Sequence, residues 1–121
     1  MPRDRSKLEV FNLAHALALE VYRVTERLPT AERFGLQGQL RRAAVSVPAN
    51  LAEGCSRRTT REYGRAIDIA LGSAVEVRYL RRLVVDLGMV SAQDLAVSIA
   101  GSDHVVRALH KLQRAIDGFE K

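Results

Sequence analysis

A proline lies in the middle of an amphipathic stretch of this chain, the run LQGQLRRAAVSVPANLAEG over residues 36–54. Proline inside a helix costs roughly 3 kcal/mol, because its ring crowds the carbonyl four residues earlier and it has no N–H to donate. The apolar residues around it nevertheless keep steps of three and four, at Leu36, Leu40, Ala43, Val47 and Leu51. We therefore predict one continuous helix that is kinked at Pro48 and stabilised there by neighbouring groups.

The other segments show the same helical periodicity. The first segment has a heptad-like seam of the kind that lines a bundle, at Val10, Ala14, Leu17, Val21, Val24 and Leu28. A chain of 121 residues with 5% aromatic residues favours a single all-α domain, spanning residues 1–121, over a sheet. We predict an up-and-down four-helix bundle with helices at about 7–28, 35–54, 60–87 and 92–118.

Local motifs predict where these helices begin and end. Pro29 should end the first helix at Leu28, since a residue before proline avoids helical geometry. Gly54 and Gly88 should close the second and third helices in the left-handed conformation. Capping residues are expected at Thr30, at Thr59 with Glu62, and at Ser91 with Asp94.

Residues 39–54 resemble the signature of four-helix-bundle proteins named after intervening sequences of bacterial 23S ribosomal RNA genes. Further matches lie at Leu28-Pro29, Glu32, Phe34-Gly35-Leu36, residues 69–73 and Glu76. The family includes accessory proteins of diversity-generating retroelements, which form basic homopentamers and bind nucleic acid and a reverse transcriptase. The resemblance implies a four-helix bundle that forms a homopentamer, with RNA, DNA or a reverse transcriptase-like protein as partner. The chain departs from the family pattern after Glu76, at Val77-Arg78 and Arg81-Arg82.

Positive charge is concentrated between residues 31 and 65. This segment has seven arginines and three glutamates, and it therefore supplies four of the five net positive charges of the chain. The planar fork of arginine can engage two phosphate oxygens at once. We hypothesise a surface that binds RNA or DNA backbone, formed by Arg41, Arg42, Arg57, Arg58, Arg61 and Arg65. The alternative is a basic, solvated corner with no ligand.

The polar residues of the signature have a structural interpretation. Ser46 and Asn50 are placed to bond carbonyls or amides near Pro48, and Glu53 is placed to pair with Arg42 or with an arginine of a neighbouring subunit. Arg41 and Arg42 are then either part of an interface clamp or ligand contacts, and the sequence leaves both roles open. We predict a structural or interface role for Ser46, Pro48, Asn50, Glu53 and Gly54.

The first and third predicted helices carry more apolar residues than one bundle needs. Besides its seam, the first has further apolar positions at Leu8, Phe11 and Leu19, and the third has apolar residues on two sides, including Ile69 and Leu87. A helix that is apolar around most of its circumference is buried on more than one side. The pattern therefore predicts self-association, and the family resemblance sharpens it to a pentamer.

No catalytic or cofactor-binding constellation stands out. His15, His104 and His110 are scattered, no phosphate-binding glycine loop is present, and we expect neither a metal nor a cofactor. One cysteine, no signal peptide and no membrane-spanning run indicate a cytoplasmic protein. We expect a non-enzymatic protein. The alternatives are a protein-interaction scaffold or accessory subunit for a nucleic-acid enzyme, and, third, a nuclease.

Overall fold

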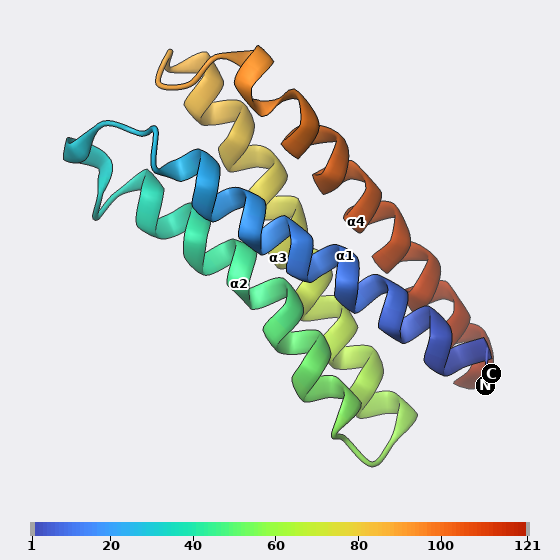
Figure 1. Ribbon diagram of the computed structural model, residues 1–121. Coiled ribbons are helices and arrows are strands. Elements are labelled where there is room, and N and C mark those ends of the chain that lie inside the picture. Colours follow the sequence, from blue (N-terminus) through green and yellow to red (C-terminus); the bar gives the residue numbers. More distant parts are fainter. Residues whose placement is uncertain (1, 121) are drawn as a thin grey trace.

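Four α-helices run alternately up and down in the computed structural model of this chain (Figure 1). The structure describes the backbone of residues 2–120 and the side chains of residues 7–94 and 102–118. The elements in chain order are α1 (Pro2–Thr25), the short 3-10 helix η1 (Thr30–Glu32), α2 (Leu36–Cys55), α3 (Thr60–Asp86) and α4 (Ala92–Glu120). The predicted all-α four-helix bundle is confirmed.

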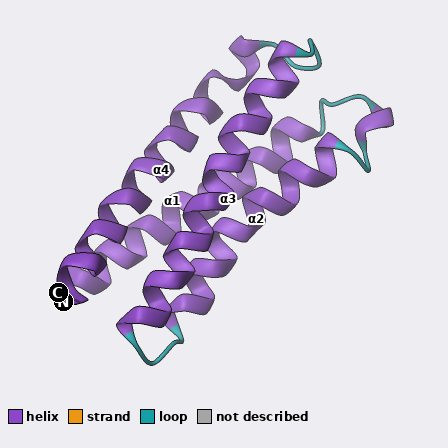
Figure 2. Ribbon diagram, turned by 180° about the vertical axis from the view of Figure 1, so that it is seen from behind, coloured by secondary structure: helices purple, strands orange, loops and turns teal. Residues whose placement is uncertain are grey.

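Each helix packs against two neighbours. α1 packs on α2 and α4, and α3 packs on the same two helices, so α1 and α3 lie diagonally across the bundle. The α1–α2 and α3–α4 connections lie at one end and the α2–α3 turn at the other (Figure 2). The core between them is mainly aliphatic and includes the buried Tyr63; its fully buried side chains include Val21, Val47, Ile67 and Leu109.

The first helix ends at Thr25, three residues before the predicted end at Leu28. The Thr25 hydroxyl lies 3.2 Å from the Tyr22 carbonyl, which the N–H of the next residue would need as its acceptor if the helix continued. The Thr25 carbonyl is in turn used by Gln37 of α2, whose Nε2 donates to it at 3.0 Å. Because partners from α2 satisfy the last turn of α1, the helix can stop before Pro29 restricts the backbone.

The prediction for Gly54 was wrong. Gly54 is buried inside α2, which continues to Cys55, and Gly88 is the one glycine with positive φ among the described residues. A Cβ atom at Gly54 would lie 2.7 Å from Cβ of Ala66 and 3.1 Å from Cδ1 of Tyr63. The glycine is therefore required by the close approach of α2 to α3, and not by a left-handed turn.

The other helix ends mostly follow their predicted motifs. Gly88 closes α3 with φ of +75°, and the Glu62 N–H donates to Oγ1 of Thr59 at 3.1 Å. The Asp94 N–H donates to Oγ of Ser91 at 3.1 Å in the same way. The predicted cap at Thr30 was wrong: this residue lies inside η1 after Pro29, and no side chain caps η1.

Candidate nucleic-acid interface

The six arginines proposed to bind nucleic acid separate into two clusters. Arg41 and Arg42 lie near the N-terminal end of α2, whereas Arg57 and Arg58 follow its C-terminal end. At 1.5 Å per residue, Arg42 lies roughly 20 Å along the helix axis from the end of α2. The arginines therefore form two separate clusters at the two ends of α2.

The cluster beyond the C-terminal end of α2 occupies the turn between α2 and α3. We call its four members, Arg57, Arg58, Arg61 and Arg65, the corner arginines. Arg57 and Arg58 lie in the turn, and Arg61 and Arg65 follow on the first two turns of α3. All four side chains are exposed. Arg57 forms an ion pair with Glu53, whereas the other three form none among the described residues. The corner thus presents three guanidinium groups without a carboxylate partner.

The backbone adds to the positive potential of this corner. The N-terminus of a helix carries a partial positive charge, so arginines in the first turns of α3 are unfavourably placed unless an anion is nearby. An open hollow of about 320 Å³ at this end of the bundle is lined by Arg57 and Arg65 together with two carboxylates, Glu53 and Glu62. The groups at this corner that are available to donate to phosphate oxygens are therefore the exposed guanidinium groups of Arg58, Arg61 and Arg65.

Arg41 takes a structural position at the junction of α1 and α2. Its Nε donates to Oγ1 of Thr25 at 2.8 Å, and its Nη2 donates to the Tyr22 carbonyl at 3.2 Å. The guanidinium carbon also lies 4.4 Å from the centroid of the Tyr22 ring. A cation at the C-terminus of α1 is favourable for the helix dipole. Arg41 therefore holds α2 against the end of α1.

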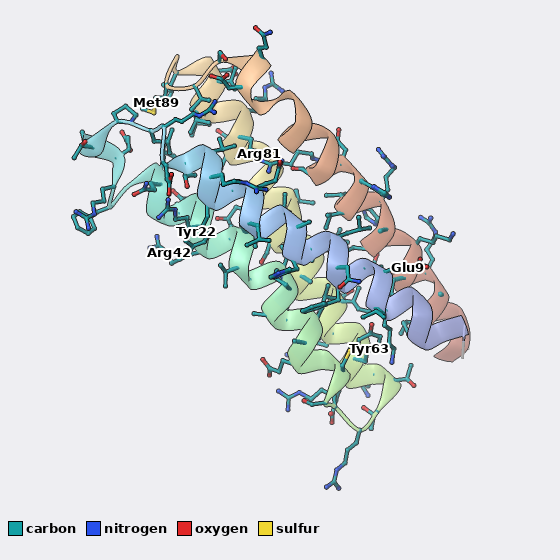
Figure 3. The ribbon with its side chains drawn as sticks, viewed as in Figure 1. Glu9, Tyr22, Arg42, Tyr63, Arg81 and Met89 are labelled. Carbon is teal, nitrogen blue, oxygen red and sulfur yellow. The ribbon has the colours of Figure 1, made fainter. Side chains whose placement is uncertain are left out.

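Arg42, the neighbour of Arg41, is exposed and forms no ion pair among the described residues. It borders an open hollow of about 670 Å³, which we call the α2 groove. Figure 3 shows Arg42 and Tyr22 together at this end of the bundle. The groove is lined by Tyr22, Arg33, Phe34, Gln37, Gly38, Arg41, Arg42, Val45, Ser46, Ala49 and Asn50.

The polar residues of the signature connect α2 to α3. Nδ2 of Asn50 donates to the Ser46 carbonyl at 2.7 Å and lies 2.9 Å from its hydroxyl. The Ser46 hydroxyl also accepts from Oγ of Ser73 at 2.9 Å. Asn50 thus satisfies a carbonyl two residues before Pro48, and α2 is continuous across that proline. The bend itself stays a prediction.

Glu53 pairs with Arg57 and not with Arg42 in this structure. Arg42 and Glu53 are eleven positions apart, which corresponds to about three helical turns. A clamp between these two side chains therefore cannot form within one copy of α2. A contact between Glu53 and an arginine of another subunit stays a prediction.

Arg81 is a buried cation that the sequence interpretation missed. Only 2% of this residue is exposed, and its Nη1 donates to the buried hydroxyl of Ser102 on α4. Burial lowers the pKa of Arg81 to about 10, against the opposing effect of the Glu20 and Asp103 carboxylates. Its place on the apolar stripe of α3, between Val77 and Val84, was the available signal.

The scattered histidines His15 and His104 lie on different helices. His15 stacks against Phe11 on α1 with ring centroids 6.3 Å apart, whereas His104 lines a hollow between α1 and α4. Among the described side chains, no three His, Cys, Asp or Glu residues lie close enough to share a metal ion. Within the described part of the chain, no helix has the length and hydropathy needed to cross a membrane.

The fold is a small helical bundle with exposed arginines at its α2–α3 corner. The family model of the 23S rRNA-intervening sequence protein matches residues 6–111. The chain belongs to this family. Among curated proteins there is no significant sequence match.

A solved structure supports the fold. A crystal structure of a protein of unknown function from the S23 ribosomal protein family of Bacteroides thetaiotaomicron VPI-5482 is similar to this chain, with a TM-score of 0.83. The two sequences are 17% identical, and the match covers 90% of this chain and 98% of that one. At this identity the likeness concerns the fold alone.

Proposed function

We propose that this chain is a non-enzymatic, self-associating bundle whose α2–α3 corner binds the backbone of RNA or DNA without reading sequence. The proposal rests mainly on the corner arginines: Arg58, Arg61 and Arg65 are exposed, carry no carboxylate partner among the described residues, and surround the positive end of α3. Phosphate contacts of this kind give affinity but no sequence readout.

Self-association is supported by exposed apolar side chains on two sides of the bundle. On α1, 60% of Leu8 and 51% of Leu19 are exposed; on α3, Val75 and Tyr79 are exposed in the same way. Because α1 and α3 are diagonal, these two faces point away from each other. Two different faces that join head to tail produce a ring when the rotation closes. The family resemblance favours five subunits.

A ring would repeat the corner arginines around one axis. Each corner alone offers only a few phosphate contacts, which are weak and salt-sensitive. Linked corners engage one strand at several points, and the second contact then occurs at high effective concentration. We propose that the assembly binds nucleic acid usefully even though a single subunit binds it weakly.

The corner is tested by the triple change Arg57→Ala, Arg58→Ala and Arg61→Ala. We expect this variant to lose at least tenfold in affinity for arbitrary RNA and DNA, measured by fluorescence anisotropy. The matched control is Arg27→Ala, Arg107→Ala and Arg114→Ala, which removes three exposed arginines elsewhere and gives the same net charge. An equal loss of affinity in both triple variants would reject the corner as the site.

Assembly is tested separately by light scattering. We expect the purified chain to be several times heavier than 13.4 kDa, and Leu19→Glu to reduce that mass. Val45→Glu is the control, because Val45 is an exposed apolar residue of α2 and lies outside both proposed faces. A particle of 13.4 kDa at high concentration would contradict self-association.

The same exposed apolar residues favour a second candidate function. A polypeptide, such as a reverse transcriptase-like protein, could cover them, and the bundle would then be an accessory subunit or scaffold. In that case the purified chain alone would not retain RNA or DNA at near-physiological salt.

A further inference from the structure

The α2 groove lies at the opposite end of α2 from the corner arginines, and its chemistry differs from theirs. Its lining contains three arginines, Arg33, Arg41 and Arg42, and two aromatic residues, Tyr22 and Phe34, but no carboxylate. The nearby Glu32 is engaged elsewhere, because its Oε1 accepts the Leu36 N–H at 3.1 Å at the start of α2. The groove lining therefore combines three arginines with two aromatic rings and contains no carboxylate.

Phe34 is the most unusual residue of this groove. The side chain lies between η1 and α2 and is 90% exposed, although burying a phenylalanine normally stabilises a protein by about 1.5–3 kcal/mol. The guanidinium carbon of Arg33 lies 5.6 Å from the centroid of its ring. With Arg33 over one face and most of the ring exposed, a planar group has access to the remaining face.

Tyr22 and Arg41 repeat this pairing in the lining of the same groove. Tyr22 is 44% exposed, and the hydrogen bonds of Arg41 to the end of α1 fix the guanidinium over its ring. The groove lining therefore has two arginine–aromatic pairs and the exposed Arg42. Gly38 also lines the groove and adds no side chain, which keeps the space open.

The α2 groove continues toward the corner. Asn50 borders both this groove and the hollow that contains Arg57 and Arg65. The two hollows together follow α2, a helix of 20 residues and therefore roughly 30 Å in length. An extended strand lying along α2 would reach both sets of arginines.

We propose that the α2 groove binds single-stranded nucleic acid and stacks an unpaired base on Phe34. Aromatic rings next to arginines are the common means of holding unpaired bases, whose flat faces are hidden in a duplex. This inference rests on the proposed function, since it assigns the strand state of the same ligand. The corner arginines hold backbone of either strand state, and Phe34 adds a preference for single strands.

The test compares oligothymidine with the duplex of the same oligothymidine paired to oligodeoxyadenosine. We expect Phe34→Ala and Phe34→Leu to lose about tenfold in affinity for the single strand and to retain affinity for the duplex. Phe34→Tyr should retain both affinities, because it keeps the ring. Leucine is the matched control for bulk, since it is apolar but has no flat face.

A tryptophan at this position gives a direct signal, because the chain contains no other. We expect the fluorescence of Phe34→Trp to be quenched by the single strand and unchanged by the duplex. Unchanged affinity of Phe34→Ala for the single strand would overturn the inference, as would an equal loss for the duplex. The inference would also be overturned if Phe34→Ala lowered the mass of the assembly and Phe34→Leu did not. Phe34 would then be a contact between subunits.

The triple variant of the corner arginines, which we call the corner variant, distinguishes the proposed stacking site from the proposed backbone site. If Arg57→Ala, Arg58→Ala and Arg61→Ala abolishes binding of both ligands while Phe34→Ala changes neither, the stacking site is wrong and the backbone site stands. If the unmodified chain binds neither ligand, both proposals are wrong.

Discussion

The two halves of α2 differ in what surrounds them, and the glycine in each half shows the difference. Near the N-terminal end, a Cβ atom at Gly38 would lie 3.3 Å from Nη1 of the flexible Arg42 side chain. Near the C-terminal end, the same atom at Gly54 would lie 2.7 Å from Cβ of Ala66. One glycine borders an open groove, whereas the other permits two helices to touch.

This difference shows that one half of α2 serves to pack the helix against α3, whereas the other half presents side chains to solvent. The C-terminal half lies close against α3 through Gly54, while Asn50, Ser46 and Ser73 connect the two helices by hydrogen bonds. The N-terminal half is held by Arg41 and leaves Arg42 exposed. Substitutions in the two halves should therefore separate stability from binding.

The largest effect on stability is expected for Gly54→Ala. The new Cβ overlaps Ala66 and Tyr63, which belong to the packed α2–α3 contact and cannot swing away. A contact this short takes the upper end of the usual cost of overpacking, about 3 kcal/mol, and the better helix propensity of alanine offsets about 1 kcal/mol. We expect a net loss of about 2 kcal/mol in urea unfolding. An increase in stability would show that α2 and α3 are less closely packed than described.

An intermediate effect is expected for Arg41→Ala. This change removes two hydrogen bonds to the end of α1 and the contact with the Tyr22 ring. We expect a loss of about 1–2 kcal/mol in the free energy of unfolding. Arg42→Ala is the adjacent control and should change stability by less than about 0.5 kcal/mol. Equal losses in the two variants would contradict the different roles of these arginines.

The smallest effect, of opposite sign, is expected for Gly38→Ala. Only the far end of Arg42 and the Arg33 carbonyl approach the new Cβ, at 3.3 and 3.5 Å, so the helix propensity of alanine should dominate. We expect a gain of about 0.5–1 kcal/mol in stability, measured by thermal unfolding. Binding of single strands should weaken, because the added methyl group narrows the α2 groove. Destabilisation by Gly38→Ala would show that Gly38, like Gly54, is required by close packing, and would contradict the difference between the two halves of α2.

The sequence predicted the bundle well because periodicity and capping are local signals. The apolar seam of α1, the cap at Thr59 and the closing Gly88 all appear where the pattern placed them. Two of the errors arose from contacts that link distant residues. Gly54 looks like a terminator until Ala66 is seen beside it, and α1 ends early because α2 supplies Gln37.

The candidate site could be predicted only in part for the same reason. The excess of arginine in residues 31–65 pointed to the corner arginines, but it also grouped Arg41 with residues at the other end of α2. Phe34 and Tyr22 are far apart in sequence and come together only in the bundle. Arg81 could have been identified from its position on the buried stripe, because a charge there requires a partner from another helix.

The most direct test of the proposed backbone contacts is the salt dependence of binding by the unmodified chain and by the corner variant. The logarithm of the association constant should fall linearly with the logarithm of salt concentration, because each neutralised phosphate releases counterions. With Arg57, Arg58 and Arg61 replaced by alanine, the slope should become shallower by roughly two to three units. An unchanged slope would show that the corner arginines do not touch phosphate and would contradict the proposed function.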